Sequence, residues 1–79
     1  DQIRVNAVAP GVVWSKYYEA MLASVPDPEA FVAGLKARSP MGRYAAPEEI
    51  APMILWLASA ESSFATGGIF TVDGGMTAW

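Results

Sequence analysis

The chain has 79 residues and a formal charge of −3, and it contains neither cysteine nor histidine. These absences exclude disulfides and thiolate metal sites, and they remove the commonest metal ligand and the commonest general base, so no metal site is expected. The five Lys and Arg residues are scattered, which excludes the basic footprint that nucleic-acid binding requires.

The first predicted element is a strand over residues 3–9, rich in β-branched and small residues and stopped by the breaker pair Pro10-Gly11. Its nearly continuous apolar character is typical of a parallel strand covered on both faces. Asn6 interrupts that character, and we expect a buried amide that satisfies nearby backbone groups. Because the strand follows Asp1 almost at once, we expect the chain to begin inside a fold, with a processed or engineered terminus as the alternative.

Two helices are predicted next. Apolar side chains recur at helical spacing from Ser15 to Val25, and Pro26 ends this helix. A second helix is expected from Asp27, with Pro28 at its first position. The sequence SPMG at 39–42 then breaks the chain again.

A third helix is predicted to start at Pro47, with two glutamates where the helix dipole favours negative charge. Pro52 lies inside it and predicts a kink or a loosened first turn. The apolar stretch 50–60 is shorter than the roughly 20 residues of a membrane span, so we expect no membrane association and a cytoplasmic location. A second strand is predicted at Ile69–Val72, ended by the turn 73–75.

The order of strand, helical insert, helix and strand predicts an α/β fold with a right-handed parallel crossover. Two parallel strands need flanking strands and helices to bury both faces, and these residues do not encode enough of them. The fold is therefore expected to be incomplete on its own.

The loop after the first strand is the candidate ligand site, because open α/β sheets bind ligands beyond the carboxyl ends of their strands. Backbone groups near Val13 could reach a carboxamide, and the Ser15 hydroxyl could bond an amide or a phosphate oxygen. A plain turn at Pro10-Gly11 is the alternative that the residues alone leave open.

Four segments together resemble the short-chain dehydrogenase/reductase family. IRVNAVAPG at 3–11 resembles its sixth strand and following turn, and GR at 42–43 with PEEIA at 47–51 resembles the entry to its last long helix. LWLAS at 55–59 continues that helix, and TGG at 66–68 through VDGG at 72–75 resembles its final strand. The resemblance implies the carboxy-terminal part of one Rossmann-like, doubly wound parallel sheet. Within that domain it implies three parts: 1–15 as strand and nicotinamide-side loop, 16–46 as substrate-loop insert, and 47–79 as last helix, last strand and tail.

The resemblance further implies an oxidoreductase that transfers a hydride between NAD or NADP and a small carbonyl or alcohol substrate. Pro10 and Gly11 match the turn beside the nicotinamide, and Val13 matches the position whose backbone contacts the carboxamide. Ser15 stands where the family usually has a threonine that hydrogen-bonds the cofactor. Following the same loop, the candidates to line or cover the substrate pocket, with helix packing as the alternative, are Trp14, Tyr17, Tyr18 and Met21.

No catalytic residue is assigned. The family's glycine-rich fingerprint, catalytic serine and tyrosine-x-x-x-lysine pair match nothing here and are expected upstream of Asp1. Tyr17 and Tyr18 are not substitutes, because Met21 and Leu22 stand four residues later. The chain alone is therefore predicted to be inactive.

Two roles remain for the apolar residues, which make up 53% of the chain. The resemblance implies a homo-oligomer that packs through Pro47–Ser59 and Ile69–Val72. A non-catalytic remnant that acts as a self-association or interaction module is the alternative from another functional class.

Overall fold

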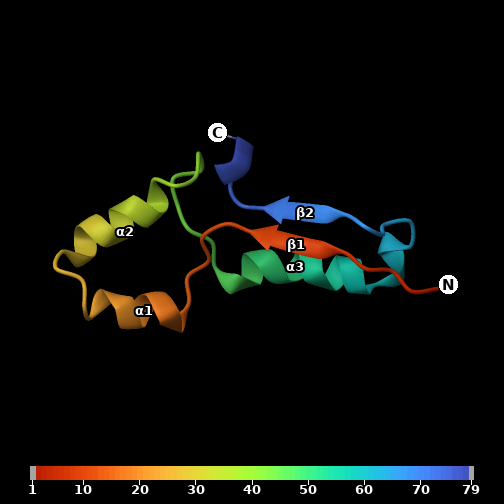
Figure 1. Cartoon of the computed structure of the whole chain (residues 1–79), viewed down its shortest axis with the longest axis horizontal. Helices are drawn as coiled ribbons and strands as arrows, with labels where there is room; N and C mark the ends of the chain where they lie inside the picture. Colours follow the sequence, from red (N-terminus) through yellow and green to blue (C-terminus); the bar gives the residue numbers. More distant parts are fainter. Residues whose placement is uncertain (1, 79) are drawn as a thin grey trace.

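The computed structural model describes residues 2–78. These residues form two short strands, three α-helices and two 3-10 turns (Figure 1). In chain order the elements are β1 (Ala7–Pro10), α1 (Lys16–Leu22), α2 (Pro28–Lys36), α3 (Pro47–Ala58), η1 (Ala60–Ser62), β2 (Ile69–Val72) and η2 (Met76–Ala78).

The two strands pair in parallel, with Ala7 opposite Ile69 and Pro10 opposite Val72. This confirms the predicted neighbours in one parallel sheet. The predicted start of the first strand is wrong, because only the segment from Ala7 onward is in register with β2. Val5 still contributes, since its carbonyl accepts the Gly67 N–H at 2.7 Å.

Helix α3 lies along one face of the sheet (Figure 1). The ring of Trp56 packs edge-on against Phe70 of β2, with 6.2 Å between ring centroids. Since side chains alternate along a strand, Phe70 and Val72 point toward the helix and Ile69 points away. Ile69 is 75% exposed. Both faces of the sheet were predicted to be buried. Within residues 2–78 only the face toward α3 is covered.

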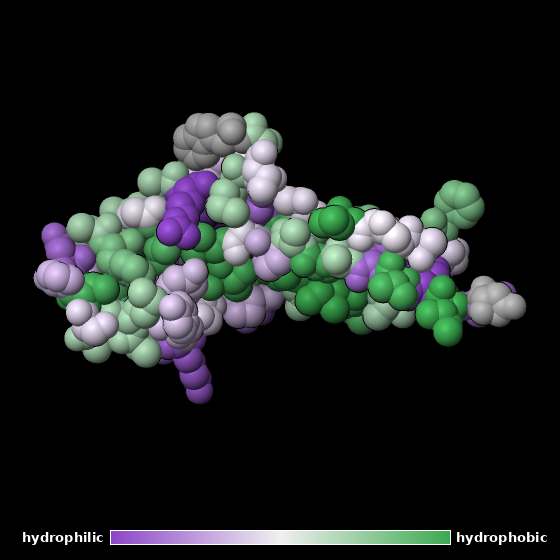
Figure 2. Space-filling model, viewed as in Figure 1, coloured by the Kyte–Doolittle hydropathy of each residue, from purple (hydrophilic) through white to green (hydrophobic). Residues whose placement is uncertain are grey.

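The molecule is elongated, with extents of 52 × 26 × 16 Å. It exposes 5771 Å², whereas a compact monomer of its mass, 8.4 kDa, exposes about 4,600 Å². Figure 2 shows hydrophobic side chains gathered on the surface over the sheet and α3. The fold is an incomplete α/β unit with apolar surface that still needs a cover.

The helices begin as predicted, and two of them end earlier. Asp27 caps α2 by accepting the Ala30 N–H at 3.2 Å. Helix α1 ends at Leu22 and not at Val25, and α3 ends at Ala58. Helix α3 runs on through Pro52 without a break. None of the helices described is long and apolar enough to cross a bilayer.

Two side chains near the amino end tie the far end of α3 to the start of the sheet. The Arg4 guanidinium donates to the carbonyls of Leu57 and Ser59, at 3.2 and 3.1 Å, and to that of Ala65 at 2.9 Å. Asn6 donates to the same Ala65 carbonyl and accepts the Gly68 N–H at 3.0 Å. The predicted role of the Asn6 amide is confirmed, although the side chain is only half-buried.

Candidate functional site

The candidate site begins where β1 ends. Pro10 is the last residue of the strand, and the Gly11 N–H donates to the Val72 carbonyl at 3.1 Å. A Cβ atom on Gly11 would lie 2.9 Å from both the Cα and the Cβ of Asp73. Glycine is needed here because the ends of the two strands approach so closely. The contact fixes the direction in which the following loop leaves the sheet.

The loop is held by an isolated parallel bridge between Val13 and Ala45. Ala45 donates its N–H to the Val12 carbonyl and accepts the Trp14 N–H, both at 2.9 Å. In such a bridge, the peptide groups of Val13 itself point away from the partner segment. No hydrogen bond to the Val13 N–H or carbonyl is formed within residues 2–78. Two backbone groups are thus left free at the position predicted to meet a carboxamide.

Ser15 adds a free hydroxyl next to them. It occupies the N-cap position of α1, where serine normally bonds a backbone N–H, but its side chain makes no such bond. The residue is exposed, and its hydroxyl has no hydrogen-bond partner in the described part of the chain. Its carbonyl accepts the Glu19 N–H at 3.2 Å. The side chain is therefore free to bond a ligand.

The Trp14 ring belongs to a group of aromatic side chains. The centroid of the Trp14 ring lies 4.9 Å from that of Tyr44 and 5.7 Å from that of Tyr18. The ring centroids of Tyr18 and Phe31 are 6.4 Å apart. We call Trp14, Tyr18, Phe31 and Tyr44 the aromatic cluster. The Lys36 ammonium sits 5.8 Å from the Tyr44 ring centre. The cluster joins the loop to α1 and α2, so two of the predicted substrate-lining residues, Trp14 and Tyr18, also serve as packing residues.

The other two predicted lining residues lie on α1. Tyr17 is 68% exposed, and its ring meets Tyr18 edge-on at 5.5 Å. Met21 is half-buried. The sequence analysis did not identify Tyr44 as a site residue. Tyr44 lies outside any periodic segment, and it contacts Trp14 because the Val13–Ala45 bridge brings their two segments together.

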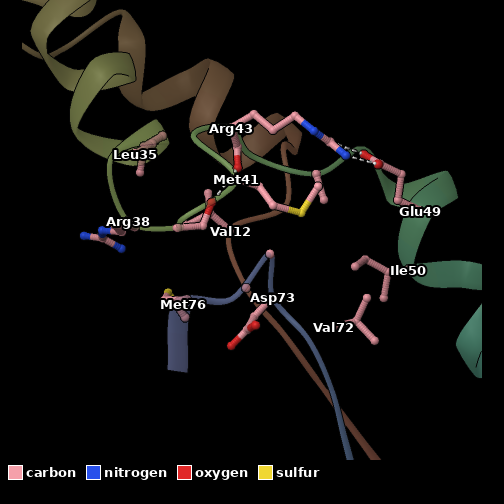
Figure 3. A pocket seen from close by; sticks show the side chains of 14 residues that line it. Val12, Leu35, Arg38, Met41, Arg43, Glu49, Ile50, Val72, Asp73 and Met76 are labelled. Atoms are coloured by element: carbon pink, nitrogen blue, oxygen red, sulfur yellow. Dashed lines mark hydrogen bonds and ion pairs between the residues drawn. The ribbon is translucent and has the colours of Figure 1, made fainter. Parts of the chain in front are cut away.

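A pocket of about 200 Å³ lies on the α3 side of the loop. Figure 3 shows Met41, Ile50 and Val72 around this cavity. Its lining comes from the strand ends, the end of α2 and the start of α3: Gly11, Val12, Leu35, Arg38, Ser39, Met41, Arg43, Ala45, Glu49, Ile50, Val72, Asp73, Gly74 and Met76. Of the predicted site residues only Gly11 belongs to it.

Three of the charged residues that line this pocket, Arg43, Glu49 and Asp73, already have hydrogen-bond partners. The Arg43 guanidinium holds the Glu49 carboxylate through two hydrogen bonds of 2.9 and 2.8 Å (dashed in Figure 3). These bonds, with one from the Ala46 N–H, lower the pKa of Glu49 from 4.5 to about 2. Hydrogen bonds from the Thr77 hydroxyl and backbone lower the pKa of Asp73. Both carboxylates cap local turns, which indicates a structural role.

Residues 2–78 contain no group of three or more acidic or otherwise metal-ligating side chains that could hold a metal ion. The features left for a ligand are the Val13 peptide groups and the Ser15 hydroxyl, at the carboxyl end of a parallel strand. Fold and loop together are those of a Rossmann-like α/β protein.

Known proteins place this arrangement in a family. The family described as Enoyl-(Acyl carrier protein) reductase matches residues 1–77. A 2-(S)-hydroxypropyl-CoM dehydrogenase 3 of Xanthobacter autotrophicus is 46% identical over 77 residues, which is 96% of this chain and 30% of that protein. A 3-oxoacyl-(acyl-carrier-protein) reductase of Thermotoga maritima is 45% identical over 74 residues, 94% of this chain and 28% of that protein.

Solved structures agree. A short chain dehydrogenase family protein from Francisella tularensis superposes with a TM-score of 0.86 at 35% identity, covering 99% of this chain and 34% of that one. An Agrobacterium tumefaciens protein crystallised with bound NADP gives 0.81 at 36% identity, covering 98% and 30%. A 4-hydroxyisoleucine dehydrogenase complexed with NADH also gives 0.81, at 31% identity, covering 98% and 30%.

The chain belongs to the short-chain dehydrogenase/reductase family. It spans about 30% of the length of the curated relatives it matches.

Proposed function

We propose that this chain is the nicotinamide-side part of an oxidoreductase that transfers a hydride between NAD or NADP and a small carbonyl or alcohol substrate. The observation that carries the proposal is the orientation of Val13. Its N–H and carbonyl face away from Ala45 and have no partner within residues 2–78, and a carboxamide offers one acceptor and two donor hydrogens to match them.

The residues present fit such a cofactor. The Val13 peptide groups would hold the carboxamide, the Ser15 hydroxyl would bond an amide or phosphate oxygen, and the Pro10-Gly11 turn would let the ring approach the backbone. The bound nicotinamide would supply the hydride, and the chain's own part would be to orient the ring. Cofactors bound to two structurally similar proteins, NADP in one and NADH in the other, support the choice of ligand class.

The chain would not catalyse alone. The family resemblance implies a proton-transferring tyrosine with a neighbouring lysine that lowers its pKa. The Lys36 ammonium lies over the face of the Tyr44 ring, which is a cation–π position and not one beside the hydroxyl. Among the described tyrosines, none is hydrogen-bonded to a lysine. The catalytic groups would come from the rest of the whole protein, by which we mean the natural reading frame that contains these residues.

The three-part division at residues 15 and 46 belongs to the same proposal. Helices α1 and α2 would form the substrate cover, with Tyr17 and Met21 on it, while α3 and β2 would carry an oligomer contact. Ile54 and Leu55 of α3 are 54% and 72% exposed, and the surface in excess of a compact monomer, about 1,200 Å², exceeds the roughly 800 Å² per partner of a standard interface. The rest of the domain would cover part of this excess surface, and a second copy of the protein would cover another part. The cytoplasmic location stays a prediction.

The test compares the whole protein with residues 1–79 alone. We expect the whole protein to bind NADH or NADPH and to oxidise it with a panel of aldehydes and ketones, whereas the isolated chain gives no turnover. Failure of the whole protein to bind either cofactor would overturn the proposal, and self-association without cofactor binding would favour an interaction module. Turnover by the isolated chain would overturn the assignment of catalysis to residues outside it.

A further inference from the structure

The bridge at Val13 is a weak element by itself. It consists of two hydrogen bonds of 2.9 Å, one donated by the Ala45 N–H and one accepted by the Ala45 carbonyl, and no further ladder extends it on either side. Water competes for such bonds at a half-exposed loop, so two of them do not fix a peptide plane firmly. Whatever holds this bridge closed also decides where the free Val13 groups point.

Tyr44 is placed to do this. It directly precedes Ala45, and its ring lies 4.9 Å from that of Trp14, tilted by 30°. Trp14 is the residue whose N–H closes the bridge. The aromatic contact thus joins the same two segments as the hydrogen bonds, and buried ring area adds cohesion that water does not replace.

The Tyr44 ring is itself fixed from a second direction. The Lys36 ammonium of α2 lies 5.8 Å from the centre of the Tyr44 ring. On the side of α1, the Trp14 ring is stacked on that of Tyr18, with 5.7 Å between ring centroids. Loop and both insert helices therefore share one set of rings. The Tyr44 hydroxyl makes no hydrogen bond among the described residues, which means that the ring, and not the phenol oxygen, makes these contacts.

We propose that Tyr44 is a positioning residue for cofactor binding: its ring holds Trp14 and thereby keeps the Val13 N–H and carbonyl aimed at the nicotinamide amide. Tyr44 does not touch the cofactor. This inference rests on the proposed function, since it concerns the same loop.

The test measures equilibrium binding of the reduced cofactor to the whole protein, and needs no knowledge of the substrate. Tyr44→Ala is expected to weaken binding about 10-fold, the loss for misaligning one or two hydrogen bonds. Tyr44→Phe keeps the ring and is expected to bind within about twofold of wild type. Phe64→Ala is the matched control, because Phe64 is a fully exposed aromatic residue outside the site.

A cofactor analogue separates positioning from general destabilisation. In the reduced 3-acetylpyridine analogue a methyl ketone replaces the amide, so no N–H is offered to the Val13 carbonyl. We expect Tyr44→Ala to weaken binding of the natural cofactor more than that of the analogue. If Tyr44→Ala does not fold, Tyr44→Leu takes its place with the same expectation.

Equal losses for the two cofactors, unchanged binding by Tyr44→Ala, or failure of Tyr44→Phe to restore affinity would each overturn the positioning role while leaving the proposed function intact. A wild-type protein that binds neither NADH nor NADPH would instead remove the proposed function, and the role of Tyr44 with it.

Discussion

Val13 and Ala45 face each other in a parallel bridge that lies outside the β1–β2 ladder. The bridge is isolated and forms three residues after β1 ends, and it brings the segment before α3 against the candidate cofactor loop. The hydrogen bonds run through Ala45 alone, so this single residue can be used to open the loop.

Ala45→Pro removes the N–H that donates to the Val12 carbonyl, and proline cannot replace that donor. We expect reduced-cofactor affinity of the whole protein to fall by about 10-fold or more. Ala45→Ser keeps the N–H and serves as the control. Fluorescence titration with NADH and NADPH is the measurement, and equal affinity for the two variants would contradict the role of the bridge.

Gly11→Ala should destabilise the whole protein. The new methyl group would lie 2.9 Å from two carbon atoms of Asp73, so the strand ends must move apart. Overpacking of this kind costs about 1–3 kcal/mol. Gly34→Ala is the matched control, since nothing lies within 4 Å of its Cβ position on α2, and alanine there should stabilise by roughly 0.5–1 kcal/mol. Urea unfolding distinguishes the two, and a neutral Gly11→Ala would refute the close approach.

Arg4→Gln is expected to loosen the end of α3. The guanidinium donates to three carbonyls. Each of them also accepts a hydrogen bond from Asn6 or Ser62, so the loss is the net contribution of hydrogen bonds from a charged donor, about 1.5–3 kcal/mol. Arg38→Gln, at an exposed arginine, is the control. Hydrogen exchange of the last turn of α3 should increase in Arg4→Gln and stay unchanged in the control; protection that persists in both variants would rule out the anchor.

The Arg43–Glu49 pair should be lost in acid. Because the folded-state pKa of Glu49 is about 2 and its ordinary value is 4.5, the contribution of this carboxylate to stability is complete above pH 4.5 and disappears as the pH falls toward 2. NMR titration of the Glu49 carboxyl carbon measures its pKa. Arg43→Gln removes the main cause of the shift, and a midpoint that stays near 2 in this variant would contradict the assignment.

Leu55→Asp tests the oligomer contact. Leu55 of α3 is 72% exposed in this chain, so a charge there should leave the packing among residues 2–78 intact but should break a symmetric interface. Trp56 is less suitable, because it packs on Phe70 and its replacement would also damage the sheet contact. Light scattering of the whole protein is expected to show a smaller assembly for Leu55→Asp. An unchanged mass would exclude this face as the interface.

Local signals predicted most of the fold. Pro28 and Pro47 begin helices because their ring sets a helical φ. The strand Ile69–Val72 follows Gly68 and ends at the turn 73–75. The strand was predicted to start at Ile3, but β1 starts at Ala7. A β-ladder begins where the partner strand is in register, and the partner here, β2, is distant in the sequence.

The candidate site was predictable in part. The residues proposed for the cofactor, such as Val13 and Ser15, follow from their place after a strand and from the family resemblance. Tyr44 and Arg4 could not be found in this way. Their roles depend on contacts between segments far apart in the sequence, up to 61 positions for Arg4, and neither residue belongs to a periodic pattern.

The distance that separates the two strands has a consequence for synthesis of the protein. Asn6 and the Gly68 N–H that it binds are 62 positions apart, so nothing can pair with that edge of β1 until β2 has left the ribosome. Closing so long a loop is slow, and contacts of this range delay folding. During translation β1 therefore stays unpaired on that side until β2 has been synthesised.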